Sequence, residues 1–165
     1  MTSWAEPGYY PGSQGRPHPG PAAVEVPAAI RAAILEHAQR EAPREACGLI
    51  VGDRAASEGG RALRWVATRN ALASPSRYEI APEDLLRVTI ETDQADEVIW
   101  GIVHSHVASP ARPSPTDVRE AHYPDALYVV VSLLDVASAP PESGPGLRAW
   151  RILDGAVHEV AIADA

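Results

Sequence analysis

Apolar residues fall into two kinds of pattern along the chain, one typical of helices and one typical of strands. Between Pro27 and Pro43 they recur every three to four positions, which predicts one helix with a single buried face. A second helix is expected to begin at Pro82, because proline suits the first helical turn and Glu83 and Asp84 follow where the helix dipole favours acids. A short third helix is expected after the proline-rich loop that follows residue 106.

Short apolar runs bounded by turn residues predict the strands. They occupy residues 48–52, 63–68, 77–80, 98–103 and 127–134, and the last run is the richest in β-branched side chains. Residues 147–162 predict a β-hairpin that turns at Asp154-Gly155. Strands interspersed with helices favour a single α/β (α+β) domain, built as a mixed, mostly antiparallel sheet flanked by helices.

Proline and glycine mark the segments expected to lie outside this domain. Residues 1–22 hold five prolines and four glycines and little that could bury surface. We therefore expect a Pro/Gly-rich disordered tail over residues 1–22 and the folded domain over residues 23–165. Residues 137–146 predict a loop rich in proline, glycine and serine.

Composition and charge narrow the class of protein. Hydrophobic residues make up 45 % of the chain and phenylalanine is absent, so we expect an aliphatic core. The net charge of −8 argues against binding to nucleic acid or to an anionic membrane, where lysine and arginine would dominate. We see no membrane span and no signal peptide. Cys47 is the single cysteine, which excludes an internal disulfide and a cysteine-based zinc cluster and suits a reducing cytoplasm.

The residues that bear chemistry gather after the run at 98–103. His104-Ser105-His106 leaves the end of a predicted strand, and Ser114 and Asp117 follow in the next segment. Each of these two segments can also be explained without a metal. A lone H-S-H is often incidental. Ser114 followed by proline is typical of a helix start with an acid in its first turn. The two readings are compatible, because such a helix would hold Asp117 toward the two histidines. Two histidines and one aspartate, with water in the open position, form a donor set typical of catalytic zinc.

The joint spacing H-x-H-x7-S-x-x-D resembles the JAMM (MPN+) family of zinc metallopeptidases. That family also has a glutamate before an apolar strand, and this chain has Glu45-Ala46-Cys47-Gly48-Leu49-Ile50-Val51-Gly52. The likeness covers roughly residues 24–162 and takes in Arg77-Tyr78, 128–132 and 151–155. In this detail the chain is most similar to the bacterial JAMM proteins that release cysteine from a ubiquitin-like sulfur-carrier protein. The resemblance implies a JAMM/MPN, cytidine-deaminase-like fold.

The resemblance also implies a role for each matching residue. His104, His106 and Asp117 would hold one Zn²⁺, Glu45 would serve as general base and then general acid, and Ser114 would donate to the oxyanion. The implied partner is a ubiquitin-like sulfur-carrier protein with a Gly-Gly C-terminus, whose tail would lie extended beside a sheet edge.

Several alternatives stay open at this point. One is an isopeptidase that removes a ubiquitin-like modifier from lysines, another a non-catalytic MPN scaffold, and a third a small-molecule or DNA-repair relative. Glu45 has a plain reading as a solvated acid after a helix. Two interpretations are open for the side chain of Cys47: a small buried hydrophobic group, or a redox-sensitive thiol near the metal. Residues 107–109 depart from the family, which often places proline directly after the second histidine, and the oligomeric state is open, a homodimer included.

Overall fold

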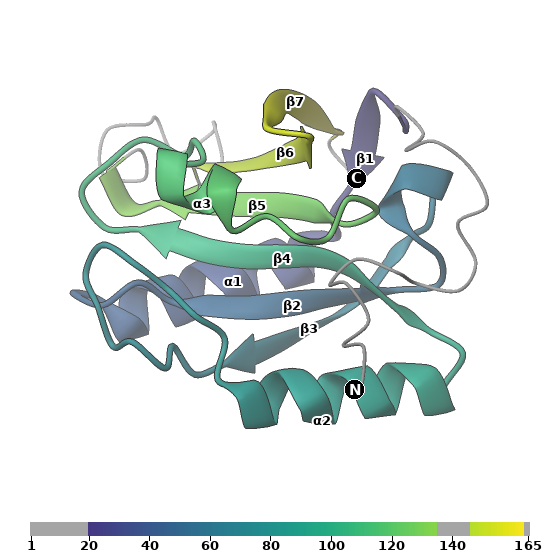
Figure 1. The fold of residues 1–165 in the computed structure, drawn as a ribbon, viewed down its shortest axis with the longest axis horizontal. Coiled ribbons are helices and arrows are strands. Elements are labelled where there is room, and N and C mark those ends of the chain that lie inside the picture. The colour runs from purple at the N-terminus through teal and green to yellow at the C-terminus, as the bar shows by residue number, and fades with distance from the viewer. Residues whose placement is uncertain (1–19, 135–145, 164–165) are drawn as a thin grey trace, which may run out of the picture.

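A seven-stranded mixed sheet organises the chain. The structure, a computed structural model, describes residues 20–134 and 146–163. Within them the strand order is β1-β7-β6-β5-β4-β2-β3, with parallel pairing only for β1 with β7 and β4 with β5 (Figure 1). The strands are β1 (Ala23–Glu25), β2 (Cys47–Gly52), β3 (Ala62–Thr68), β4 (Val98–His106), β5 (Leu127–Ser132), β6 (Leu147–Leu153) and β7 (Ala156–Ala163).

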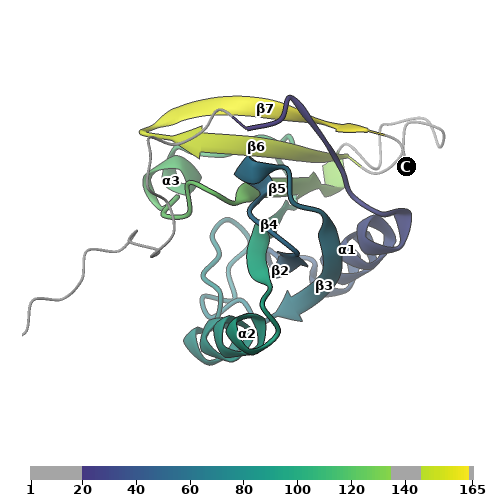
Figure 2. The ribbon, with the colours of Figure 1, turned by 90° about the vertical axis from the view of Figure 1, so that its right-hand side faces the viewer.

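Helices cover both faces of the sheet. They are α1 (Ala28–Glu41), a 3-10 turn η1 (Ala56–Glu58), α2 (Pro82–Gln94) and α3 (Pro115–Arg119). Figure 2 shows α1 and α3 on opposite sides of the sheet. Two buried clusters result: Ile30 and Ile34 of α1 pack in one, and Val88 of α2 packs in the other, with Val118 of α3 at its edge. None of the helices in the described ranges is long and apolar enough to cross a membrane.

The pleat of β4 decides which residues face which cluster. Val103 lies in the α1 cluster and Ile102 in the α2 cluster, because successive strand residues point to opposite faces. β5 is buried at every position, which explains its continuous apolar run. The residues that continue β4 therefore also alternate between the two faces, and His104 and His106 follow Ile102 onto the side of α2 and α3.

Most of the predicted elements are confirmed. The hairpin turns where expected, with positive φ at Asp154 (48°) and Gly155 (79°), as a two-residue hairpin turn of mirror-image type requires. β4 extends beyond the expected residue 103 to His106. The three-residue β1 was not predicted, because so short a strand carries no readable alternation.

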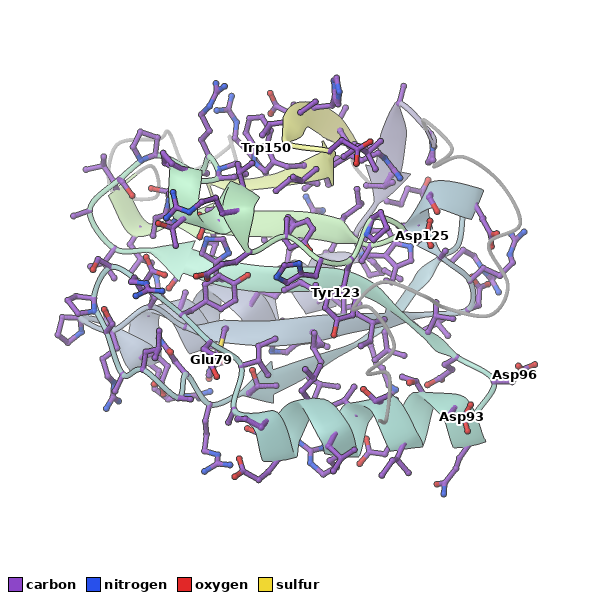
Figure 3. All side chains as sticks on the ribbon, in the orientation of Figure 1. Glu79, Asp93, Asp96, Tyr123, Asp125 and Trp150 are labelled. Atoms are coloured by element: carbon purple, nitrogen blue, oxygen red, sulfur yellow. The ribbon has the colours of Figure 1, made fainter. Side chains whose placement is uncertain are left out.

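The prediction of a strand at residues 77–80 is wrong. Only an isolated bridge joins Ile80 to Asn70. The peptide N–H of Glu79 donates to the side chain of Asn70 (3.1 Å) rather than to a main-chain carbonyl, so no regular ladder can form there. Figure 3 shows Glu79 on this segment, which runs from the loop after β3 into α2.

Two predicted segments fall largely outside the described residues. The tail expected over residues 1–22 is described only from Gly20, and Ala22 accepts a hydrogen bond from Ala161 of β7 (3.1 Å). Of the loop expected at residues 137–146, only Gly146 is described.

Candidate metal and catalytic site

His104, His106 and Asp117 converge on one point beside the end of β4. The two histidines project from the same face of the strand, and Asp117 reaches them from the first turn of α3. The Nε2 atoms of the histidines lie 3.1 Å apart, and Asp117 Oδ2 lies 3.1 Å from His104 Nε2 and 3.3 Å from His106 Nε2. All three residues offer a ligand atom within 4.8 Å of the others.

This geometry fits a tetrahedral zinc ion. Bonds of about 2.0 Å at tetrahedral angles would separate the ligand atoms by roughly 3.3 Å, close to the three separations in this cluster. His106 Nδ1 donates to the carbonyl of Pro110 (2.8 Å), which leaves the lone pair of the neutral ring on Nε2. A lone pair facing a carboxylate oxygen at 3.3 Å is repulsive unless a proton or a metal cation lies between them.

Electrostatics also suits a cation. Desolvation by burial lowers the pKa of His104 and so favours the neutral imidazole that a metal binds. Burial alone would raise the pKa of Asp117, but hydrogen bonds with His104 and His106 hold it well below its ordinary value. Burial alone would lower the pKa of His106, but its contact with Asp117 raises it above its ordinary value. The ionised carboxylate therefore favours positive charge between these side chains, whether a proton or a metal ion supplies it.

The start of α3 fixes Asp117 in place. Ser114 is the N-cap: its Oγ accepts from the N–H of Asp117 (3.1 Å), and its own N–H donates to Asp117 Oδ2 (2.7 Å). This reciprocal pair is a capping box. Asp117 can therefore cap the start of α3 and serve as a metal ligand at the same time, because the cap points its carboxylate at the histidines. Because Ser114 Oγ only accepts within this box, its hydroxyl proton is left to donate elsewhere.

Glu45 is buried beside the cluster. It is 5 % exposed, so the reading as a solvated acid is wrong. Burial raises the pKa of its carboxyl to about 7; His106 lowers it and Asp117 raises it, which places the carboxyl within electrostatic reach of both. A carboxyl with a pKa near neutrality is suited to accept and return a proton.

Ser105 ties the Glu45 segment to the two histidines. Its side chain points to the opposite face from theirs and is fully buried. The Oγ accepts from the N–H of Ala46 (2.7 Å), and the N–H of Ser105 donates to the carbonyl of Ala46 (2.9 Å). These two bonds extend the β2–β4 contact past the register pair of Cys47 and His104 and hold Glu45 next to the cluster.

Two contacts of the histidines were not predicted from the sequence. The Tyr78 ring stacks on His104, with centroids 4.3 Å apart and planes inclined by 14°. The carbonyl of Pro110 fixes the tautomer of His106. The loop that holds Pro110 is itself anchored, because Trp150 of β6 donates from Nε1 to the carbonyl of Ala111 (3.0 Å); Figure 3 shows Trp150 on β6. Arg77-Tyr78 carried a sequence signal only through the family likeness, and that signal named no role.

Cys47 is a buried thiol. It is 1 % exposed and lies opposite His104 in the β2–β4 register. Burial raises its pKa to about 11, and its Sγ contacts Thr68 Oγ1 at 3.4 Å. The described cluster of potential metal ligands does not include it. The structure therefore favours the small buried hydrophobe over the redox-sensitive group.

The raised pKa of Glu45 predicts an unusual pH dependence in the protein stripped of metal. Between pH 4.5 and about 7 the folded state keeps a proton that the unfolded chain has released, so the free energy of unfolding falls as pH rises. We expect metal-free Glu45→Gln to exceed metal-free wild type in stability by on the order of 3 kcal/mol at pH 8. Urea unfolding at pH 5, 6, 7 and 8 measures this difference, which should shrink toward the acidic end. An unchanging difference across that range would contradict the assigned shift.

Comparison with known proteins agrees with this fold. Residues 27–153 match the Prok-JAB family, described as prokaryotic homologs of the JAB domain. The CysO-cysteine peptidase of Mycobacterium tuberculosis is 42 % identical over 127 residues, which cover 77 % of this chain and 81 % of that protein. The desampylase of Haloferax volcanii is 31 % identical over 114 residues, covering 66 % and 80 %. The solution structure of protein DSY2949 from Desulfitobacterium hafniense superposes with a TM-score of 0.70 at 30 % identity, covering 86 % of this chain and 90 % of that one. The chain belongs to the Prok-JAB family of JAB-domain proteins.

Proposed function

We propose that this protein is a zinc-dependent peptidase of the JAMM type. It hydrolyses the amide bond after the C-terminal glycine of a ubiquitin-like sulfur-carrier protein and releases cysteine from a carrier–cysteine adduct. The observation that carries the proposal is the convergence of His104, His106 and Asp117 with the buried carboxyl of Glu45 beside them. Relatives named CysO-cysteine peptidase and desampylase support a hydrolase that acts on such proteins. The reaction would serve cysteine biosynthesis or another thiocarboxylate-dependent pathway.

Each residue has a chemical task in this proposal. His104, His106 and Asp117 would hold the zinc ion, which would lower the pKa of a bound water to about 7 and polarise the scissile carbonyl. Glu45 accepts the proton of the attacking water as the new C–O bond forms. It then passes that proton to the leaving amine as the C–N bond breaks. Ser114 donates its hydroxyl proton in a hydrogen bond to the carbonyl oxygen as negative charge develops there.

The segment that carries Tyr78 offers a place for the tail of the carrier. The bridge to Asn70 uses the carbonyl of Glu79, and the peptide groups of Tyr78 and Ile80 make no main-chain hydrogen bond within the described ranges. An extended peptide can pair with such an open edge by strand addition. Because the Tyr78 ring stacks on His104, a tail bound there would end close to the cluster. A Gly-Gly terminus suits this approach, since it brings no side chains into the site.

A second candidate activity is the removal of a ubiquitin-like modifier from lysine side chains of target proteins. The relative named desampylase favours it. The two activities share the carrier tail and differ in the leaving amine, which is the α-amine of cysteine in one and a lysine ε-amine in the other. The loop at residues 107–109, where this chain lacks the proline of many relatives, is the segment we expect to influence that choice. A non-catalytic scaffold would have no need of the buried carboxyl.

Cleavage of defined adducts tests the proposal. The probe is a small ubiquitin-fold protein that ends in Gly-Gly, prepared with a C-terminal cysteine and, separately, joined to a lysine ε-amine. We expect the protein with zinc to remove cysteine, seen as loss of one cysteine residue by mass spectrometry, and a chelator to abolish the loss. Cleavage of the lysine adduct alone would select the isopeptidase, and no chelator-sensitive cleavage of either would favour the scaffold.

We also place the protein in the cytoplasm, which suits its single, buried thiol.

A further inference from the structure

The side chain of Asn70 joins two segments that the proposed mechanism needs. Its Nδ2 donates to the carbonyl of Glu45 and to the carbonyl of Arg77, both at 3.0 Å. Its Oδ1 accepts from the N–H of Leu72 (3.0 Å) and the N–H of Glu79 (3.1 Å). A carboxamide has two N–H donors and two acceptor lone pairs, so all four of its hydrogen-bonding positions are occupied.

Two of these segments matter to the proposed mechanism, namely the segment of the proposed base and the segment of Tyr78. The bond to Glu45 fixes the backbone of the proposed base, whose N–H also donates to Ser74 (2.8 Å). The bonds to Arg77 and Glu79 bracket Tyr78, which stacks on His104 and carries the open peptide edge. The planar carboxamide of Asn70 therefore sets the distance between the backbone of Glu45 and the Tyr78 edge that would receive the carrier tail.

We propose that Asn70 is a positioning residue that holds Glu45 in register with the Tyr78 edge. Its catalytic effect rests on the proposed function. Its link between the two segments does not, and can be measured without any substrate. Near-attack geometry is sensitive on the scale of about 1 Å, and a misplacement of that size costs roughly 100-fold in rate. The side chain itself touches neither metal nor substrate in this role.

Aspartate is the sharpest replacement, because it keeps the shape of asparagine and its acceptors but has no donors. Asn70→Asp would set a carboxylate oxygen against the carbonyls of Glu45 and Arg77, and the two segments should separate. The matched control is Asp53→Asn, which replaces aspartate by asparagine. Asp53 directly follows β2, whereas Glu45 lies just before the start of that strand. Asp53 accepts from the N–H (2.7 Å) and Nε (2.8 Å) of Arg61, and its neighbour Gly52 pairs with Val98, at the opposite end of the β2–β4 ladder from His104.

Two readouts test the proposal on zinc-loaded protein below its unfolding transition. In hydrogen–deuterium exchange, Asn70→Asp should speed exchange in peptides that cover residues 44–46 and 77–80 together, whereas Asp53→Asn should change neither. In kinetics normalised to bound zinc, Asn70→Asp should lower kcat and kcat/KM equally, on the order of 10–100-fold, since only transition-state alignment is lost. Asp53→Asn should stay within twofold of wild type.

Exchange that speeds up only around residues 70–72, or a kcat within twofold of wild type, would overturn the proposal. A rise in KM with unchanged kcat would overturn it too, because it would make Asn70 a tail-binding residue. If Asn70→Asp does not fold, Asn70→Ser, which keeps a single donor, is judged by the same outcomes. If wild type cleaves neither adduct, the proposed function fails, while the exchange experiment still decides whether Asn70 links the two segments.

Discussion

Glu45→Gln is expected to keep zinc bound and to lower kcat by about 10²–10⁴-fold, the usual contribution of a general acid–base group. Glutamine has the size of glutamate and fits the buried position, but it cannot take a proton from water. His104, His106 and Asp117 are untouched, so metal content, measured by elemental analysis, should match wild type.

The matched control for this variant is Glu41→Gln. Glu41 lies at the end of α1, four residues earlier, and pairs with Arg44 at 3.3 Å, a contact expected to contribute little. The Glu41→Gln variant should retain wild-type kcat. If Glu45→Gln turns over an adduct as fast as wild type does, Glu45 has no part in the mechanism. If this variant loses zinc, Glu45 is a metal ligand instead.

Asp117→Asn is expected to lose both zinc and activity. Asparagine preserves the shape and can still accept the hydrogen bond from Ser114 that caps α3, but it removes the negative charge that faces both histidines. Loss of an outer-shell partner of a metal ligand typically costs 10–100-fold in affinity, and loss of a ligand charge should cost more. Competition with a chromogenic chelator measures the affinity.

The chain offers a closely matched control in Asp84→Asn. Asp84 occupies the same third position of a helix that begins with proline, α2, and pairs with Arg69 rather than with histidines. Both replacements remove a carboxylate from a helix start, so their effects on helix stability should be similar. Only Asp117→Asn should change zinc binding. Equal zinc affinity in the two variants would show that Asp117 is a cap and no ligand.

The capping role of Asp117 and the ligand role proposed for it link the local fold to the chemistry. A capping box needs a hydrogen-bond acceptor at the third helical position, and here that acceptor is a carboxylate that points out of the helix start toward β4. Ser114 sets that direction while keeping its own proton for donation. Backbone and helix contacts hold the proposed ligands in place, and such preorganisation lowers the cost of binding a metal ion.

Much of the fold could be read from short-range patterns. The helices after Pro27 and Pro82, the buried strands and the hairpin at Asp154-Gly155 depend on residue spacing and on the turn preferences of proline and glycine. The strand expected at 77–80 was wrong for a reason that spacing does not contain. A side chain from another segment, Asn70, takes the hydrogen bond that a neighbouring strand would have taken.

The sequence by itself determined which residue types are present at which spacing, and therefore the candidate donor set of His104, His106 and Asp117 and the candidate base Glu45. Only the tertiary structure decided that Glu45 is buried beside them, because that depends on the pairing of β2 with β4, segments about sixty residues apart. It likewise decided the tautomer of His106, through the carbonyl of Pro110. Spacing records what the backbone does locally, whereas the protonation state and position of a buried group depend on the desolvation and hydrogen bonds that distant segments impose.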